Sequence, residues 1–219
     1  MGQKLRYFGL SLHATKAHDS FIGIYSVLDT IGLDRKHAYK TASNQSNDKQ
    51  MGCPCRLPAE KYPETADWGP LFWKLLHALA ERAGKQRDAV VTQPDEVRAW
   101  IQLLTLLQPT IPCDVCRNHY SIWLAAHPPT VLSAMPYNEV GDWVRNYLWE
   151  LHNTVNEGND RPALPYSELA TLYRDVSITA TWRALEPVMK RAIALNGITL
   201  FPWKKWLGFV RTLQGIYGA

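Results

Sequence analysis

Helical spacing dominates the greater part of this sequence, where apolar residues recur every three or four positions. This periodicity is typical of amphipathic helices. It predicts helices over about residues 67–84, 94–109, 112–126 and 137–157, with Asp67 as the cap of the first. Prolines and glycines stand between these segments, as they do at helix ends. Four helices with short connections predict an all-α fold built on a four-helix bundle.

Changes in composition divide the chain into four parts. Residues 1–50 form an N-terminal extension that ends in a polar linker, and residues 51–66 form an arm that carries Cys-Pro-Cys. Residues 67–165 hold the bundle. Residues 166–219 contain further helical patterns rich in aromatic side chains. We expect this last segment to pack on the bundle or across a dimer, in preference to lying on a membrane surface.

Composition narrows the class of protein. With 46% hydrophobic and 20% charged residues, the 219-residue chain is globular in character. The net charge of +4 is small and comes from scattered residues, so nucleic acid is not the expected partner. No apolar run is long enough to cross a bilayer, and no secretory signal is evident. We therefore expect an intracellular, reducing setting, where a pair of cysteines more often binds metal or reacts than staples the fold.

The stretch IPCDVCRNHY holds two of the four cysteines. Pro112 suits the first turn of a helix, which puts Cys113 at the helix N-terminus. Unpaired amide groups and the positive end of the helix dipole there favour a thiolate. Cys116, His119 and Tyr120 are spaced to share one face of that helix.

The residues of this stretch leave three interpretations open. The pair is a zinc half-site completed by Cys53 and Cys55 or by a histidine, a thioredoxin-like motif, or a redox disulfide beside a cofactor. The thioredoxin-like motif needs a βαβ context that the sequence lacks. Inert buried thiols are the plainest alternative.

Two other helices carry polar or aromatic clusters. Trp73 and His77 are four residues apart on the first, and His152 and Asn156 are four apart on the fourth, with Asn153 beside them. Each cluster alone is consistent with core packing or solvent exposure. Together with Cys-x-x-Cys, they indicate a large, flat, polar ligand with ring nitrogens and phosphates.

Three blocks in this order, WKLLH, PCDVCRNH and HNTVN, resemble the Erv/ALR family of FAD-dependent sulfhydryl oxidases over about residues 66–165. The resemblance implies a four-helix bundle with a short fifth helix, bound FAD, a homodimer, and a Cys-x-x-Cys disulfide against the flavin. It implies that Cys113 exchanges disulfides with the substrate and that Cys116 lies nearer the flavin. It implies no metal site. The residues expected at the FAD site are Gly69, Trp73, His77, His119, Tyr120, His152, Asn153, Asn156 and Arg161.

The sequence departs from the family pattern after the bundle. Many members have a further cysteine near the position of Tyr166, but no cysteine follows Cys116 here. Cys53 and Cys55 stand where family members often carry a shuttle pair that passes electrons from substrate to the buried disulfide. A strained, exposed disulfide of this kind suits that role.

The expected function is therefore oxidation of protein dithiols to disulfides, with electrons passing through FAD to dioxygen to give hydrogen peroxide. The alternatives are a zinc-stabilised helical interaction module without catalysis, held by the four cysteines, and a degenerate oxidase that serves as a scaffold. Related enzymes occur in large DNA viruses and in the mitochondrial intermembrane space. The expected setting is the host cytoplasm or the virion, with the intermembrane space as the alternative.

Overall fold

A computed structural model describes residues 60–87 and 92–219, and in these residues the backbone forms seven α-helices and no strands. Residues 1–59, which include Cys53 and Cys55, and residues 88–91 lie outside the described part. The helices are α2 (Thr65–Ala80), α3 (Thr92–Leu107), α4 (Asp114–Ala126), α5 (Tyr137–Glu157), α6 (Leu169–Tyr173), α7 (Ile178–Ala194) and α8 (Leu200–Tyr217). Three short 3-10 helices, η1 (Gln108–Thr110), η2 (Pro129–Ala134) and η3 (Tyr166–Glu168), join them. The prediction of an all-α fold is confirmed.

The first helix begins earlier than the sequence predicted. Glu64, not Asp67, is the N-cap of α2, and Asp67 is the third residue of the helix. The Asp67 carboxylate accepts a hydrogen bond from the Glu64 amide at 2.9 Å. The two side chains thus form a reciprocal capping box, in which each satisfies an amide that the first turn leaves unpaired.

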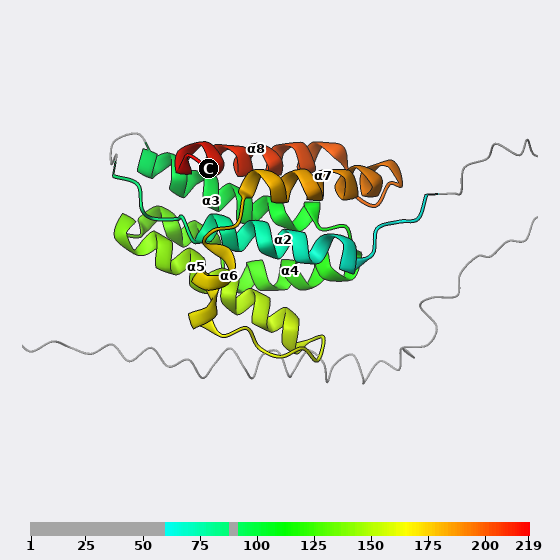
Figure 1. Ribbon diagram of the computed structural model, residues 1–219, viewed down its shortest axis with the longest axis horizontal. Helices are drawn as coiled ribbons and strands as arrows, with labels where there is room; N and C mark the ends of the chain where they lie inside the picture. The colour runs from blue at the N-terminus through cyan, green and yellow to red at the C-terminus, as the bar shows by residue number, and fades with distance from the viewer. Residues whose placement is uncertain (1–59, 88–91) are drawn as a thin grey trace, which may run out of the picture. The chain divides into compact units, whose positions relative to one another are not determined.

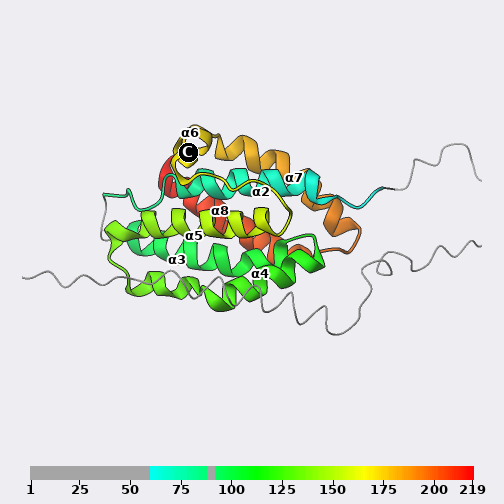
Figure 2. The same cartoon turned by 90° about the horizontal axis from the view of Figure 1, so that it is seen from below.

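Apart from the short α6, the described helices lie in three tiers, which Figure 1 shows from the side and Figure 2 from below. α2 and α3 form the middle tier, α4 and α5 lie on one side of it, and α7 and α8 lie on the other. α8 packs on α3, and α7 packs on α2. Since each helix of the middle tier is covered on both sides, the core runs through α2 and α3.

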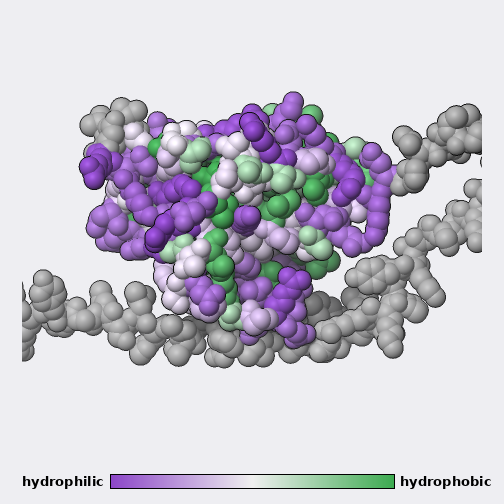
Figure 3. Space-filling view, viewed as in Figure 1, coloured by the Kyte–Doolittle hydropathy of each residue, from purple (hydrophilic) through white to green (hydrophobic). Residues whose placement is uncertain are grey.

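The C-terminal helices pack on the bundle, which confirms the interpretation of that segment. The aromatic side of α8 is turned inward. Its buried residues are Trp203, Trp206, Leu207, Val210 and Leu213. On the face shown in Figure 3, apolar patches interrupt the hydrophilic surface over α2 and α7. Among the described helices, none has the length and apolar character needed to cross a membrane.

A pair of glycines fixes the contact between the end of α2 and the start of α5. A Cβ on Gly84 would lie 2.5 Å from the Gly141 amide nitrogen, and a Cβ on Gly141 would lie 2.5 Å from the Ala83 carbonyl oxygen. Gly84 also has a φ of +69°, which favours glycine. The buried Glu81 carboxylate accepts a hydrogen bond from Arg145 of α5 at 3.0 Å. These contacts align α2 and α5, the two helices that carry Trp73, His77 and His152.

Candidate functional site

The Cys113–Cys116 pair forms a disulfide at the N-terminus of α4, with the two Cα atoms 5.2 Å apart. Cys113 is the N-cap, and its sulfur accepts a hydrogen bond from the Cys116 amide at 3.2 Å. The prediction that Cys113 lies at a helix N-terminus is confirmed, although α4 begins at Asp114 and Pro112 precedes it. Because that amide and the helix dipole point at the sulfur, they would stabilise a Cys113 thiolate after reduction.

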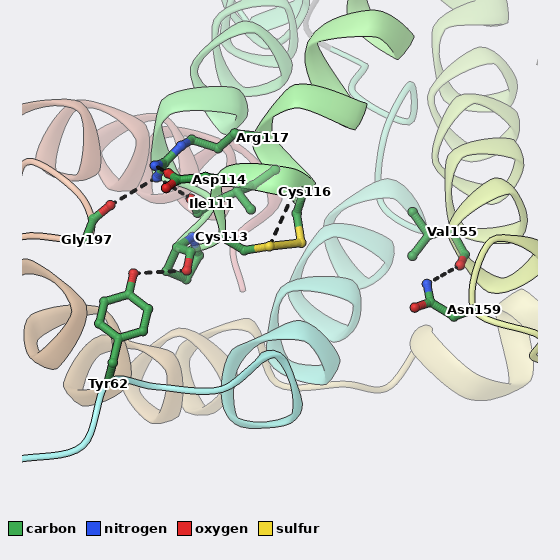
Figure 4. Close-up of a disulfide and its surroundings, with 10 residues drawn as sticks. Tyr62, Ile111, Cys113, Asp114, Cys116, Arg117, Val155, Asn159 and Gly197 are labelled. Atoms are coloured by element: carbon green, nitrogen blue, oxygen red, sulfur yellow. Dashed lines mark hydrogen bonds and ion pairs between the residues drawn. A yellow bond between two sulfur atoms is a disulfide. The ribbon is translucent and has the colours of Figure 1, made fainter. Parts of the chain in front are cut away.

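The disulfide is accessible from outside. Both cysteines are half-buried, and Val115 between them is 64% exposed. Figure 4 shows Val155, near the end of α5, and Asn159, just beyond that helix, on the Cys116 side of the disulfide. Val155 is also exposed. The disulfide thus lies near the surface of α4, between the core and exposed neighbours.

Four rings carried by α2, α5 and α6 lie close together. The Trp73 indole lies parallel to the His152 imidazole, with centroids 4.0 Å apart and an interplanar angle of 6°. His77 shares a hydrogen bond with His152 at 3.1 Å between Nε2 and Nδ1. The His77 imidazole also stacks on the Tyr173 ring, with the ring centroids 4.6 Å apart. We call Trp73, His77, His152 and Tyr173 the ring cluster.

Burial keeps both imidazoles of the ring cluster neutral. Desolvation is the main cause that lowers the pKa of His77 to about 3, and the nearby His152 adds to it. Desolvation also lowers the pKa of His152 to about 4, with a further contribution from the positive charge of Arg161. A neutral imidazole both donates and accepts hydrogen bonds. The ring cluster therefore offers flat faces and uncharged polar edges near neutral pH.

The two asparagines of HNTVN hold the loop that follows α5. The Asn153 side chain donates to the Leu164 carbonyl at 3.1 Å and accepts from the Leu164 amide at 2.7 Å. Asn156 donates to the Pro162 carbonyl at 3.3 Å, and its own carbonyl accepts from the Arg161 amide. Within the described residues, the asparagines therefore act on their own chain and bring Arg161 back beside His152.

The spacing predicts that Cys116, His119 and Tyr120 share one face of α4, and in the structure His119 and Tyr120 lie in different surroundings. Tyr120 is buried, and its hydroxyl donates to the Leu104 carbonyl of α3 at 2.8 Å. His119 is exposed. The two side chains diverge because successive positions on a helix differ by about 100°, and the α3 side of α4 is the core.

Gly69 lies buried on α2, but no close contact within the chain requires it. A Cβ there would meet Thr65 Cγ2 at 3.6 Å, an ordinary contact distance. Sequence reasoning also missed Tyr173, whose ring completes the ring cluster. No spacing in the sequence links Tyr173 to His77, because their approach depends on the turn that brings α6 back against α2.

The zinc interpretation involves Cys53 and Cys55, which lie outside the described residues. In residues 60–87 and 92–219, no group of three or more His, Cys, Asp or Glu side chains is arranged to hold a metal ion. Cys113 and Cys116 are bonded to each other. The structure thus presents this pair as a disulfide.

A helical bundle with an accessible Cys-x-x-Cys disulfide and a half-buried ring cluster defines a protein equipped for thiol–disulfide exchange. Residues 70–174 match the model of the Erv1 / Alr family. The part of the chain that carries the disulfide and the ring cluster is therefore similar to the Erv1 / Alr family.

Two viral relatives resemble the chain. One is protein 088R of Frog virus 3 (isolate Goorha), which is named as an FAD-linked sulfhydryl oxidase. It is 30% identical to this chain over 109 residues, and these make up 48% of this chain and 65% of that protein. The other is an FAD-linked sulfhydryl oxidase of African swine fever virus, 26% identical over 109 residues, which are 48% of this chain and 79% of that protein. The match thus spans less than two thirds of the Frog virus 3 protein. No solved structure matches the chain.

Proposed function

We propose that this protein is an FAD-linked sulfhydryl oxidase that forms disulfide bonds in protein dithiols. The observation that carries the proposal is the accessible Cys113–Cys116 disulfide at the N-terminus of α4. Its first cysteine is stabilised as a leaving and attacking thiolate. The match of residues 70–174 to the Erv1 / Alr family model and the names of the viral relatives support the same activity.

The residues of the site fit FAD. The ring cluster offers parallel aromatic and imidazole faces of the kind that stack on a flat heterocycle. Its neutral imidazoles suit uncharged ring nitrogens, and the exposed guanidinium of Arg161 suits phosphate. We therefore assign Trp73, His77, His152 and Arg161 to hold FAD. Asn153 and Asn156 would act on the cofactor through the loop that they position.

The exchange itself uses only sulfur chemistry. A substrate thiolate attacks Cys113 Sγ, the Cys113–Cys116 bond breaks, and Cys116 leaves as a thiolate. A second substrate thiolate then attacks the mixed disulfide and releases Cys113. The substrate loses two electrons and two protons, and the enzyme pair gains them. Bound FAD would supply the two-electron acceptor that restores the disulfide, with dioxygen as the final acceptor and hydrogen peroxide as the product.

Cys53 and Cys55 are proposed as the shuttle pair that first meets the substrate. Tyr62 is hydrogen-bonded to the Pro112 carbonyl, immediately before Cys113. Cys55 lies seven positions before Tyr62, and an extended chain of that length spans at most about 25 Å. We also propose a homodimer, in the host cytoplasm or virion of a large DNA virus, with the mitochondrial intermembrane space as the alternative.

The first experiment is the visible spectrum of the purified protein, recorded with oxygen consumption after dithiothreitol is added. A flavin band that bleaches and returns while oxygen is consumed is the expected result. Cys116→Ser should keep the flavin and lose turnover. A colourless protein with stoichiometric zinc would overturn the proposal in favour of a zinc-stabilised module, and flavin without turnover would indicate a scaffold.

A further inference from the structure

Tyr62 reaches the backbone next to the reactive disulfide from outside the family match. Its hydroxyl donates a hydrogen bond to the Pro112 carbonyl at 2.9 Å, and Pro112 directly precedes Cys113. Figure 4 shows Tyr62 and Gly197 on the Cys113 side of the disulfide. Neither Tyr62 nor Gly197 lies within residues 70–174.

Gly197 makes room for the Tyr62 ring. A Cβ on Gly197 would lie 2.0 Å from the Tyr62 hydroxyl oxygen and 2.2 Å from a ring carbon. These distances are far below any van der Waals contact, so any other residue at position 197 must displace the ring. Gly197 follows the end of α7, so the C-terminal segment takes part in this contact.

Arg117 joins the same group from α4. One guanidinium nitrogen donates to the Ile111 carbonyl at 2.9 Å and to the Gly197 carbonyl at 3.0 Å. The guanidinium also pairs with Asp114 in the first turn of α4. The Arg117 amide donates to the Cys113 carbonyl at 2.8 Å. The carbonyls of residues 111, 112 and 113 are thus all held by hydrogen bonds.

We propose that Tyr62, Gly197 and Arg117 form a brace that positions Cys113 and favours its disulfide with Cys116 over the open dithiol. The three are positioning residues, since they act on the backbone of residues 111–113. The inference deepens the proposed function and rests on it only for the role of Cys113.

The physical reason is the freedom of the segment before α4. Cys113 is an N-cap with extended backbone dihedrals (φ −151°, ψ 116°), and the bonds that α4 itself supplies go to Cys113, so the helix alone does not hold residues 111 and 112. If this segment moves, the two thiols of the dithiol state meet less often, and the disulfide becomes easier to reduce. A segment held in place by hydrogen bonds keeps the two sulfurs together at little entropic cost.

The brace has a thermodynamic signature that a purely structural contact lacks. A contact that stabilises the disulfide and dithiol states equally raises the melting temperature but leaves the redox equilibrium unchanged. A contact that positions Cys113 in the disulfide state shifts that equilibrium. The decisive quantity is therefore the equilibrium constant between the Cys113–Cys116 pair and glutathione.

The test uses the full-length protein with Cys53→Ser and Cys55→Ser, so that only the Cys113–Cys116 pair exchanges. The holoenzyme is equilibrated with glutathione buffers under anaerobic conditions, quenched by alkylation and analysed by mass spectrometry. Tyr62→Phe should lower the equilibrium constant for disulfide formation roughly 3- to 10-fold, the size of one net hydrogen bond. Gly197→Ala should lower it at least as much. Gly208→Ala, where a Cβ meets nothing within 4 Å, is the matched control and should not change it.

A double variant separates the brace from a general loss of stability. If Gly197→Ala acts only by displacing the Tyr62 ring, the Tyr62→Ala and Gly197→Ala pair should match Tyr62→Ala alone. Lower melting temperatures in both redox states with an unchanged glutathione equilibrium would overturn the brace. Oxygen consumption by the unmodified protein tests the proposed function separately, since the equilibrium needs no turnover.

Discussion

In the ring cluster, His77 and His152 have pKa values well below that of an ordinary histidine. Their shared hydrogen bond joins α2 to α5, and desolvation lowers both pKa values. Burial of a charged imidazole is costly, so the folded protein keeps both rings neutral. The pair is thus suited to the uncharged ring system of a ligand, and it also makes the free energy of unfolding sensitive to acid.

We predict that the free energy of unfolding falls as the pH drops from about 6.5 to about 4. An unfolded histidine has a pKa near 6.5, whereas the folded values are about 3 and about 4. Between these pKa values, the unfolded chain binds protons that the folded chain does not bind. The contribution of the two histidines to the free energy of unfolding is therefore fully present above pH 6.5 and is lost as the pH falls below it. Each imidazole contributes a slope of up to about 1.4 kcal/mol per pH unit.

Urea unfolding between pH 4 and pH 7 measures this slope. His77→Gln should lower the slope by the contribution of one imidazole, up to about 1.4 kcal/mol per pH unit, because one titrating ring is removed. His119→Gln, at an exposed side chain, is the matched control for loss of an imidazole. An undiminished slope in His77→Gln would show that His77 does not supply the acid sensitivity.

Asn153 is predicted to stabilise the fold even without a ligand. Asn153→Ala leaves the Leu164 amide without its side-chain acceptor and should cost about 1–3 kcal/mol of unfolding free energy. Asn146→Ala, at an exposed asparagine on the same helix, should change stability by no more than about 0.5 kcal/mol. Both are measured by urea unfolding of flavin-free protein. Equal stability of the two variants would mean that Asn153 serves the ligand alone.

At the scale of the elements, α8 is tied to the bundle through a buried carboxylate on α3. Glu96 is fully buried and accepts hydrogen bonds from the Gly84 amide at 2.8 Å and the Tyr217 hydroxyl at 2.8 Å. The Tyr137 hydroxyl, at the start of α5, donates to its other oxygen. Tyr217 in turn accepts from the Trp100 indole at 2.8 Å. One carboxylate therefore joins the end of α8 to α3, to the loop after α2 and to α5.

Tyr217→Phe should destabilise the protein by about 1–3 kcal/mol, because it leaves the buried Trp100 indole N–H unpaired and removes a donor from Glu96. Tyr166→Phe, at an exposed ring in η3, is the matched control. Chemical unfolding compares the two variants. If Tyr217→Phe behaves like Tyr166→Phe, hydrophobic packing alone holds α8 to α3.

At the scale of the whole molecule, the two C-terminal helices cover the middle tier, whose helix α2 carries Trp73 and His77 of the ring cluster. α7 packs on α2, so residues outside the family match support the helix that holds Trp73 and His77. Gly197, which follows α7, contributes a second contact, because its carbonyl accepts a hydrogen bond from Arg117 in the helix that Cys113 caps. The C-terminal segment is therefore part of one core with the bundle.

FAD is predicted to raise the melting temperature of flavin-stripped protein in proportion to the logarithm of its concentration. A ligand that binds only the folded state adds about 2.7 kcal/mol at one hundred times its dissociation constant. Differential scanning fluorimetry measures the shift. Trp73→Ala should weaken it, whereas Phe201→Ala, at a ring that is 75% exposed on α8, should retain it. No shift in the unmodified protein would contradict FAD binding.

Much of the fold and part of the site were predictable from the sequence. The predicted fourth helix matches α5 at both ends, and Cys113 lies at a helix N-terminus as predicted. Apolar periodicity, proline and glycine act on residues nearby in the chain, so the positions and ends of helices can be predicted from the local sequence. The spacing of Trp73 and His77 on one face followed in the same way.

The tertiary structure decided which partner each polar side chain meets. Tyr120 turns to Leu104 in the core, Asn153 bonds the loop at Leu164, and Tyr62 fills the space over Gly197. Each contact joins residues between 11 and 135 positions apart, a separation fixed only when the helices pack. The sequence by itself determined the helices and the order of the reactive residues. Packing determined which of them face the disulfide, because a side chain's environment is set by the helix across from it.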